Sequence, residues 1–123
     1  AGVRAVVNTC REYPGPEAEY AQCGIVQFRV PTVDFTAPRL EDVERAVEFI
    51  RTHAARGESV YVHCKAGRAR SATVALCYLV ATRGCSAEQA QHILQTHRRQ
   101  VHKTVYRLEV VRQFCARHGP ATA

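Results

Sequence analysis

Hydrophobic residues recur along this chain in two spacings that alternate from one segment to the next. Three short runs rich in β-branched residues, at residues 3–9, 25–30 and 59–63, are typical of buried strands. Elsewhere apolar positions return every three or four residues, which predicts helices. We expect these helices over residues 17–23, 38–56, 71–83, 86–97 and 104–117. Strands that alternate with helices predict an α/β fold, with a small, largely parallel central sheet flanked by helices.

A few residues mark the expected ends of these elements. Pro31 is expected to end the second strand, and Thr36 or Ala37 to cap the helix that follows. Ser86 begins a capping box for the helix that runs to residue 97. Residues 71–83 are apolar on nearly every side, so we expect them to form the most buried helix.

Length and composition favour one domain with one core. The chain has 123 residues, of which 46% are hydrophobic. It opens almost directly in a strand, without Met or a targeting segment, so we expect residues 1–123 to be a catalytic domain whose leading segment is trimmed. No apolar run approaches the ~18 residues that a membrane span needs.

Charge and cysteine usage narrow the classes of partner. The net charge of +6 favours anionic partners such as phosphorylated molecules, an anionic membrane surface or nucleic acid. Nucleic acid is disfavoured because basic and aromatic residues do not interleave and no zinc-type spacing is present. The six cysteines are spread through apolar segments, which predicts thiols rather than a disulfide framework. No metal or cofactor is expected, and the chain is expected to be a monomer.

Residues 60–71, VYVHCKAGRARS, predict a buried strand that feeds a tight loop and then a helix. Such a junction directs backbone N–H groups and the positive end of a helix dipole at one small volume, which favours an anion. Cys64 begins the loop and Arg70 closes it, and the planar guanidinium can hold two phosphate oxygens. The dipole, the loop amides and Arg70 are expected to lower the pKa of Cys64 below the ~8.5 of an ordinary thiol. The loop therefore predicts a thiolate nucleophile inside a phosphate-binding site.

The order His63, Cys64, five residues, Arg70, Ser71 resembles the signature of the cysteine-dependent phosphatases, the tyrosine and dual-specificity phosphatase superfamily. Within it, nearly the whole chain is similar to the mitochondrial phosphatidylglycerophosphate phosphatase type. The matching segments are residues 32–36, 59–68, 70–73 and 108–111. The chain departs from that pattern at Ala69, where a Ser is expected, and at residues 13–16, where an acidic stretch is expected. These departures bear on lipid specificity more than on catalysis.

Other interpretations of the loop fit less well. A buried core cysteine followed by chance basic residues would not explain why residue types, spacing, strand and helix agree. A rhodanese-type sulfur carrier also begins a loop with Cys before a helix, but its loop does not end in Arg-Ser after five residues. A catalytically dead phosphate-binding module would require that Cys64, Arg70 or Asp34 be replaced, and all three are present.

The resemblance implies a role for each residue of the loop. Cys64 would attack phosphorus and carry the phosphoryl group, while Arg70 and the loop amides bind the equatorial oxygens. Asp34 is the candidate general acid and later general base, and its alternative is a turn-stabilising or helix-capping Asp. The expected phosphate-binding residues are Lys65, Ala66, Gly67, Arg68, Ala69 and Arg70.

Three further residues are assigned supporting roles. Ser71 would donate a hydrogen bond to the sulfur and help it leave, and its alternative is an ordinary first-turn Ser. His63 would order the loop from beneath, unless it is simply a core His. Cys10 follows the first strand, as in the similar tensin-type phosphatases, and is the candidate redox partner of Cys64. Its alternative is a buried Cys without a redox role.

The implied function is hydrolysis of a phosphomonoester, above all of phosphatidylglycerophosphate to phosphatidylglycerol for cardiolipin biosynthesis in the mitochondrion. Lys65 and Arg68 add two cations to the loop, which suits an anionic phospholipid head group unless both face solvent or glutamates. A basic run could rest on an anionic bilayer or could be a solvated connector: Arg98, Arg99, His102 and Lys103. The alternatives are a protein dual-specificity phosphatase or a phosphoinositide phosphatase, and a cytoplasmic location.

Overall fold

The computed structural model describes residues 3–33, 36–64 and 69–120. In this part of the chain, the strands β1 (Val3–Cys10), β2 (Val26–Thr32) and β3 (Ser59–His63) form one sheet in the order β2-β1-β3. Both pairs of neighbouring strands are parallel, which confirms the predicted parallel sheet. Parallel strands end at the same edge, so Cys10, Thr32 and His63 all lie at the carboxyl edge of the sheet.

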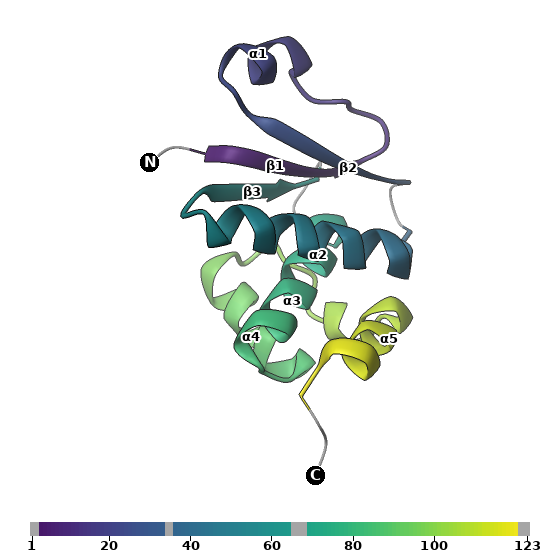
Figure 1. The fold of residues 1–123 in the computed structure, drawn as a ribbon. Helices are drawn as coiled ribbons and strands as arrows, with labels where there is room; N and C mark the ends of the chain where they lie inside the picture. The colour runs from purple at the N-terminus through teal and green to yellow at the C-terminus, as the bar shows by residue number, and fades with distance from the viewer. Residues whose placement is uncertain (1–2, 34–35, 65–68, 121–123) are drawn as a thin grey trace.

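Helices cover the two faces of the sheet unequally (Figure 1). The short α1 (Glu17–Gln22) lies on one side, while α2 (Leu40–Ala55) lies directly against the other. Beyond α2 on that second side come α3, α4, α5 and a short 3₁₀ turn, η1. Their bounds are Arg70–Arg83 for α3, Ala87–His97 for α4, Glu109–His118 for α5 and Val105–Arg107 for η1. This arrangement confirms the predicted α/β fold with helices flanking the sheet.

The core has two neighbouring parts. In one, Val7 and Val30 of the sheet pack against Ile50 of α2 and Val74 of α3, because alternate strand residues point to the same face. In the other, α3 packs between α2, α4 and α5, around buried residues such as Phe114. Nine of the 14 residues of α3 are buried, more than in any other helix of the described chain, as its apolar sequence predicted.

One strand continues past its expected end. β2 runs to Thr32, so the prediction that Pro31 ends it is wrong. β2 is an edge strand whose only partner in the described sheet is β1. A proline there can be accommodated because its missing N–H need not interrupt the ladder. The extra residue matters, because Thr32 brings its carbonyl group to the carboxyl edge.

The capping prediction for α2 is also wrong. The helix begins at Leu40 with Arg39 as its N-cap, and no side-chain hydrogen bond caps it. Thr36 and Ala37 therefore lie ahead of the helix. The Thr36 hydroxyl instead donates to the backbone oxygen of Val33 at 2.5 Å and closes a turn.

The last predicted helix is divided in two. Residues 104–117 were expected to be continuous, but η1 is followed by Leu108 in an extended conformation, and α5 starts only at Glu109. The buried side chain of Gln91 accepts a hydrogen bond from the Tyr106 backbone N–H at 3.0 Å and donates to His102 O at 2.7 Å. This contact holds the backbone before α5 against α4, and the helix is interrupted at Leu108, whose ψ of 141° is not helical.

The structure confirms the predicted capping box at the start of α4. Gln89 N donates to Ser86 Oγ at 3.1 Å, and Ser86 N donates to Gln89 Oε1 at 2.9 Å. We predict that Ser86→Ala lowers the free energy of unfolding by about 1 kcal/mol, because it leaves a helix-terminal donor without its acceptor. Denaturant unfolding would measure the loss. Ser86→Asp, which keeps an acceptor, is the control and should lose much less; equal losses would contradict the capping role.

Candidate active site

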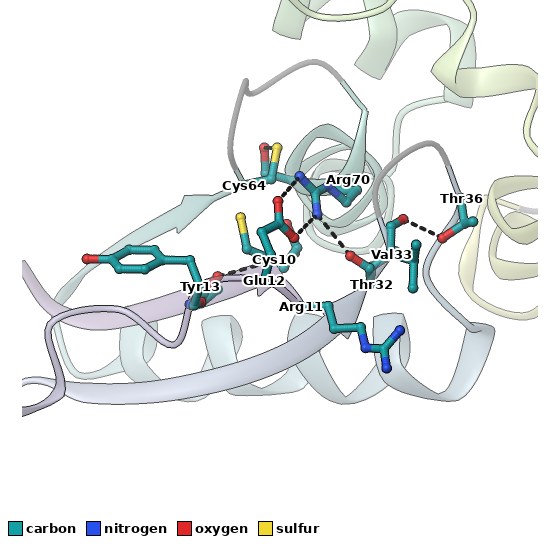
Figure 2. Close-up of polar contacts among 12 residues, drawn as sticks. Cys10, Arg11, Glu12, Tyr13, Thr32, Val33, Thr36, Cys64 and Arg70 are labelled. Carbon is teal, nitrogen blue, oxygen red and sulfur yellow. Dashed lines mark hydrogen bonds and ion pairs between the residues drawn. The ribbon is translucent and has the colours of Figure 1, made fainter.

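Arg70 is the centre of a cluster at the carboxyl edge of the sheet. It is the first residue of α3, and only 3% of its surface is exposed. Its Nη1 donates to the backbone oxygen of Thr32 at 2.9 Å and to Glu12 Oε1 at 2.8 Å, and its Nη2 donates to Glu12 Oε2 at 3.0 Å (Figure 2). The guanidinium is therefore oriented by residues that follow β1 and end β2.

Glu12 is a residue of the cluster that the sequence analysis missed. It lies in the loop after β1 and forms a two-pronged ion pair with Arg70, a geometry that fixes the plane of the guanidinium. The Glu12 side chain is 43% exposed, whereas that of Arg70 is 4% exposed. A buried cation needs a nearby anion, so Glu12 both neutralises and orients Arg70. The sequence did contain a signal for Glu12, because a parallel sheet places the residues that follow β1 beside the loop that begins at Cys64.

Cys64 and Ser71 meet across the beginning of α3. Cys64 directly follows β3, and Ser71 is the second residue of α3 and is buried. Cys64 Sγ and Ser71 Oγ are 3.2 Å apart, within hydrogen-bond distance. A hydroxyl at this distance can donate to a thiolate sulfur. The geometry is therefore compatible with the role predicted for Ser71.

Ala69 is the N-cap residue of α3. It makes no side-chain capping hydrogen bond, and its backbone oxygen accepts from Thr73 N at 2.8 Å and from Thr73 Oγ1 at 2.7 Å. The positive end of a 14-residue helix thus begins beside Cys64 and Arg70. Its dipole favours negative charge at this edge of the sheet.

A cavity of about 180 Å³ opens beside the cluster. Cys64 and Ser71 line it, together with Val62 of β3 and Leu94 of α4. Arg98, the first residue of the basic run, also lines it. At least one cation of that run therefore shares a cavity with the predicted nucleophile.

Residues 1–115 match the family model described as the dual specificity phosphatase catalytic domain. The chain belongs to this family. It is 35% identical over 118 residues to phosphatidylglycerophosphatase and protein-tyrosine phosphatase 1 of Homo sapiens, a match that covers 91% of this chain and 59% of that protein. The predicted resemblance to the dual-specificity phosphatases, and to the phosphatidylglycerophosphate phosphatase type among them, is thus confirmed. The chain spans less than two thirds of this relative's length.

Solved structures of phosphatases share the fold. The crystal structure of Tk-PTP in its active form superposes with a TM-score of 0.85 at 29% identity, covering 94% of this chain and 80% of that one. The crystal structure of PTPMT1 in complex with PI(5)P has a TM-score of 0.77 at 32% identity, with the same coverage of 94% and 80%. The prediction of a cysteine-phosphatase fold is therefore confirmed.

Several residues of the predicted dual-specificity phosphatase site lie outside the described residues. These are Asp34 and four loop residues, Lys65, Ala66, Gly67 and Arg68. Thr32, two positions before Asp34, bonds to Arg70 through its backbone oxygen, so the chain on the amino side of Asp34 contacts the site. The roles assigned to these residues stay predictions.

His63 ends β3 and directly precedes the predicted nucleophile. Its ring stacks on that of Tyr61 with the centroids 5.3 Å apart. Its Nε2 is buried and has no hydrogen-bond partner among the described residues. Burial lowers the pKa of His63, because the charged imidazolium would lose hydration there. The predicted role, ordering the loop from beneath, stays a prediction.

The cysteines of the described chain differ in environment. Cys10 is buried at the end of β1, close to Glu12 and at the same edge of the sheet as Cys64 (Figure 2). All six cysteines are thiols, and the predicted redox pairing of Cys10 with Cys64 stays a prediction. Burial raises the pKa of Cys77 and of Cys115, so both thiols are protonated at neutral pH.

Two further findings concern residues 3–33, 36–64 and 69–120. They contain no group of three His, Cys, Asp or Glu side chains that could hold a metal ion. They also contain no helix with the length and apolar character of a membrane span.

The ion pair predicts a catalytic defect for Glu12→Gln. The amide can accept one of the two hydrogen bonds, but its NH₂ group then faces the other guanidinium nitrogen. We expect kcat/KM on an aryl phosphate to fall by about 10-fold to 100-fold, since a hydrogen bond to a charged group contributes about 1.5–3 kcal/mol. Steady-state kinetics would measure the loss, with Glu17→Gln on α1 as the charge-matched control. A faster Glu12→Gln enzyme would show that the carboxylate competes with phosphate instead of orienting Arg70.

Proposed function

We propose that this protein hydrolyses phosphomonoesters through a cysteinyl-phosphate intermediate, and that its substrate is phosphatidylglycerophosphate, which it converts to phosphatidylglycerol. The observation that carries the proposal is the meeting of Arg70, Cys64 and Ser71 at the beginning of α3, with the Cys64 and Ser71 side chains 3.2 Å apart. A guanidinium, a thiol and a helix N-terminus together favour binding and attack of a phosphate group. Membership of the dual specificity phosphatase family supports the same chemistry.

In the first step, Cys64 Sγ attacks phosphorus. The S–P bond forms as the P–O bond to the leaving alcohol breaks, and Asp34 gives its proton to the departing oxygen. Arg70 and the loop amides of residues 65–70 bind the equatorial oxygens, whose charge must be stabilised in the transition state. The alcohol then leaves, and the phosphoryl group remains on sulfur.

In the second step, water attacks the phosphoryl group. Asp34, now a carboxylate, takes a proton from the water, and the S–P bond breaks to give inorganic phosphate. The Ser71 hydroxyl donates a hydrogen bond to the sulfur and stabilises the thiolate as it leaves. No metal or cofactor takes part in this scheme.

The proposal of a lipid substrate rests on charge and on the relatives. Lys65 and Arg68 add cations to the loop, and the net charge of the chain is +6. The human relative's name includes both a lipid phosphatase and a protein-tyrosine phosphatase activity, and the PTPMT1 crystal contains PI(5)P, a lipid phosphate. A protein dual-specificity phosphatase is the alternative, which the second half of that name favours.

The proposal also covers the oligomeric state of the enzyme, its contact with the membrane and its location. We expect a monomer that touches an anionic membrane peripherally through the basic run at residues 98–103. Resemblance to the phosphatidylglycerophosphate phosphatase type favours the mitochondrion, with the cytoplasm as the alternative location.

Comparative turnover tests the proposal. Phosphate release is measured from phosphatidylglycerophosphate, from PI(5)P and from a phosphotyrosyl peptide, each with wild type and with Cys64→Ser. We expect kcat/KM to be at least about tenfold higher for phosphatidylglycerophosphate. Cys64→Ser should be inactive yet still bind the lipid, because a hydroxyl is a far poorer nucleophile than a thiolate at neutral pH. A preference for the peptide would favour the alternative, and substantial turnover by Cys64→Ser would remove Cys64 from the mechanism.

The role of Asp34 makes a separate prediction. Asp34→Asn should lower kcat by about 10²–10⁴ on a lipid phosphate, whose alkoxide is a poor leaving group that needs a proton. An activated aryl phosphate should lose much less. Steady-state kinetics on both substrates would measure the difference, with Asp42→Asn on α2 as the control. Equal losses on the two substrates would indicate that Asp34 is structural.

A further inference from the structure

The loop that carries Glu12 is held by polar side chains of the sheet rather than by burial of its own residues. The loop residues on either side of Glu12 are exposed. Asn8 Nδ2 of β1 donates to the backbone oxygen of Tyr13 at 2.8 Å, and Gln27 Nε2 of β2 donates to that of Pro14 at 3.0 Å. The position of the loop therefore depends on a few hydrogen bonds.

Arg29 of β2 makes the largest number of these contacts through one nitrogen. Its Nη2 donates to the backbone oxygens of Cys10 at 2.8 Å, Arg11 at 3.3 Å and Tyr13 at 3.4 Å. These three carbonyl groups lie on both sides of Glu12 in the sequence. A cation is suited to this place, because three carbonyl dipoles converge on it with their negative ends. Three backbone oxygens of the loop thus face the guanidinium of Arg29.

The orientation of Arg29 is set by the sheet. It lies opposite Asn8 in the register of β1 and β2, whereas its neighbours Phe28 and Val30 pack toward the helices. Arg29 therefore points to the other face, beneath the loop. Its Nε is buried without a hydrogen-bond partner among the described residues, and the contacts of Nη2 have to offset that loss.

The same loop reaches the guanidinium of Arg70 in two ways. The Glu12 carboxylate contacts both Nη atoms, and the Arg11 backbone N–H donates at 3.4 Å to the Thr32 oxygen that also accepts from Arg70 Nη1. A change in the loop is therefore transmitted to Arg70. Misplacement of a catalytic contact by about 1 Å can lower a rate by about 10²-fold.

We propose that Arg29 is a positioning residue for the phosphatase reaction: it holds the loop so that Glu12 orients Arg70. The inference rests on the proposed function, because it concerns the group that would bind the transferred phosphate. Arg29 acts through the loop backbone and Glu12 rather than on the substrate. Its loss leaves Asn8 and Gln27 to hold the loop, so the fold survives while the Glu12 carboxylate is displaced.

A double-mutant cycle separates this role from a general loss of stability. Arg29→Gln should lower kcat/KM on an aryl phosphate by about 10-fold to 100-fold. In the Glu12→Gln background, the same change should lower it by less than about twofold, because the contact through which Arg29 acts is already lost. Arg112→Gln, an exposed arginine of α5, removes the same charge and should leave activity unchanged.

Two kinetic outcomes would overturn the inference. The first is that the kcat/KM of Arg29→Gln equals that of Arg112→Gln. The second is that the fold-loss in kcat/KM of the double mutant equals the product of the two single-mutant losses. That result would mean that the two residues act independently, since independent sites contribute additively in free energy. If Arg29→Gln melts below the assay temperature, Arg29→Lys, which keeps a cation with three donors, enters the same cycle.

A second measurement does not depend on turnover. The NMR signals of the Arg70 side chain report how freely its guanidinium rotates, and the contacts with Glu12 and Thr32 should slow that rotation in the wild type. We expect Arg29→Gln to speed it and Arg112→Gln not to. If the wild type releases no phosphate from any substrate, the proposed function fails. Unchanged Arg70 signals in Arg29→Gln would instead overturn the role of Arg29.

Discussion

The site depends on the burial of one positive charge. Arg70 is 3% exposed, and a guanidinium removed from water to this degree needs oxygen acceptors on several sides. The acceptors seen here are the Glu12 carboxylate and the Thr32 backbone oxygen. They come from the loop after β1 and from the end of β2, so one side chain ties two strand ends to the beginning of α3. The strand order makes this geometry available, because β1 lies between β2 and β3, so its carboxyl end lies between theirs.

The elements that position this charge were predictable where local sequence and burial agree. β3 was predicted at residues 59–63, as observed, because a short β-branched run before a glycine-containing loop leaves little choice. The capping box at Ser86 uses only neighbouring atoms, so its sequence signal carried through to the structure. Cys64 and Ser71 of the loop signature lie 3.2 Å apart at the start of α3, and the roles assigned to them stay predictions.

The failures have different causes. η1 and α5 are separated by the non-helical backbone of Leu108, and no glycine or proline in residues 104–117 marks that break in the sequence. Glu12 was missed because its partner Arg70 lies 58 residues away in the sequence. Sequence patterns predicted the faces of elements better than their ends, and they predict poorly which polar group on one element satisfies a group on another.

The connection between β1 and β2 has two parts, a constrained loop up to Gly15 and the helix α1, which is free to vary. Gly15 has a φ of +81°, and a β-carbon there would lie 2.7 Å from Gln27 Oε1, so the loop that carries Glu12 has little room for change at this point. The following α1 buries none of its residues. Insertions, deletions or exchanged side chains in α1 would therefore cost the folded state little, while Tyr13 and Pro14 remain hydrogen-bonded to the sheet and Glu12 to Arg70. In evolutionary terms, α1 is a segment in which descendants of this chain can diversify without disturbing the charged cluster below it.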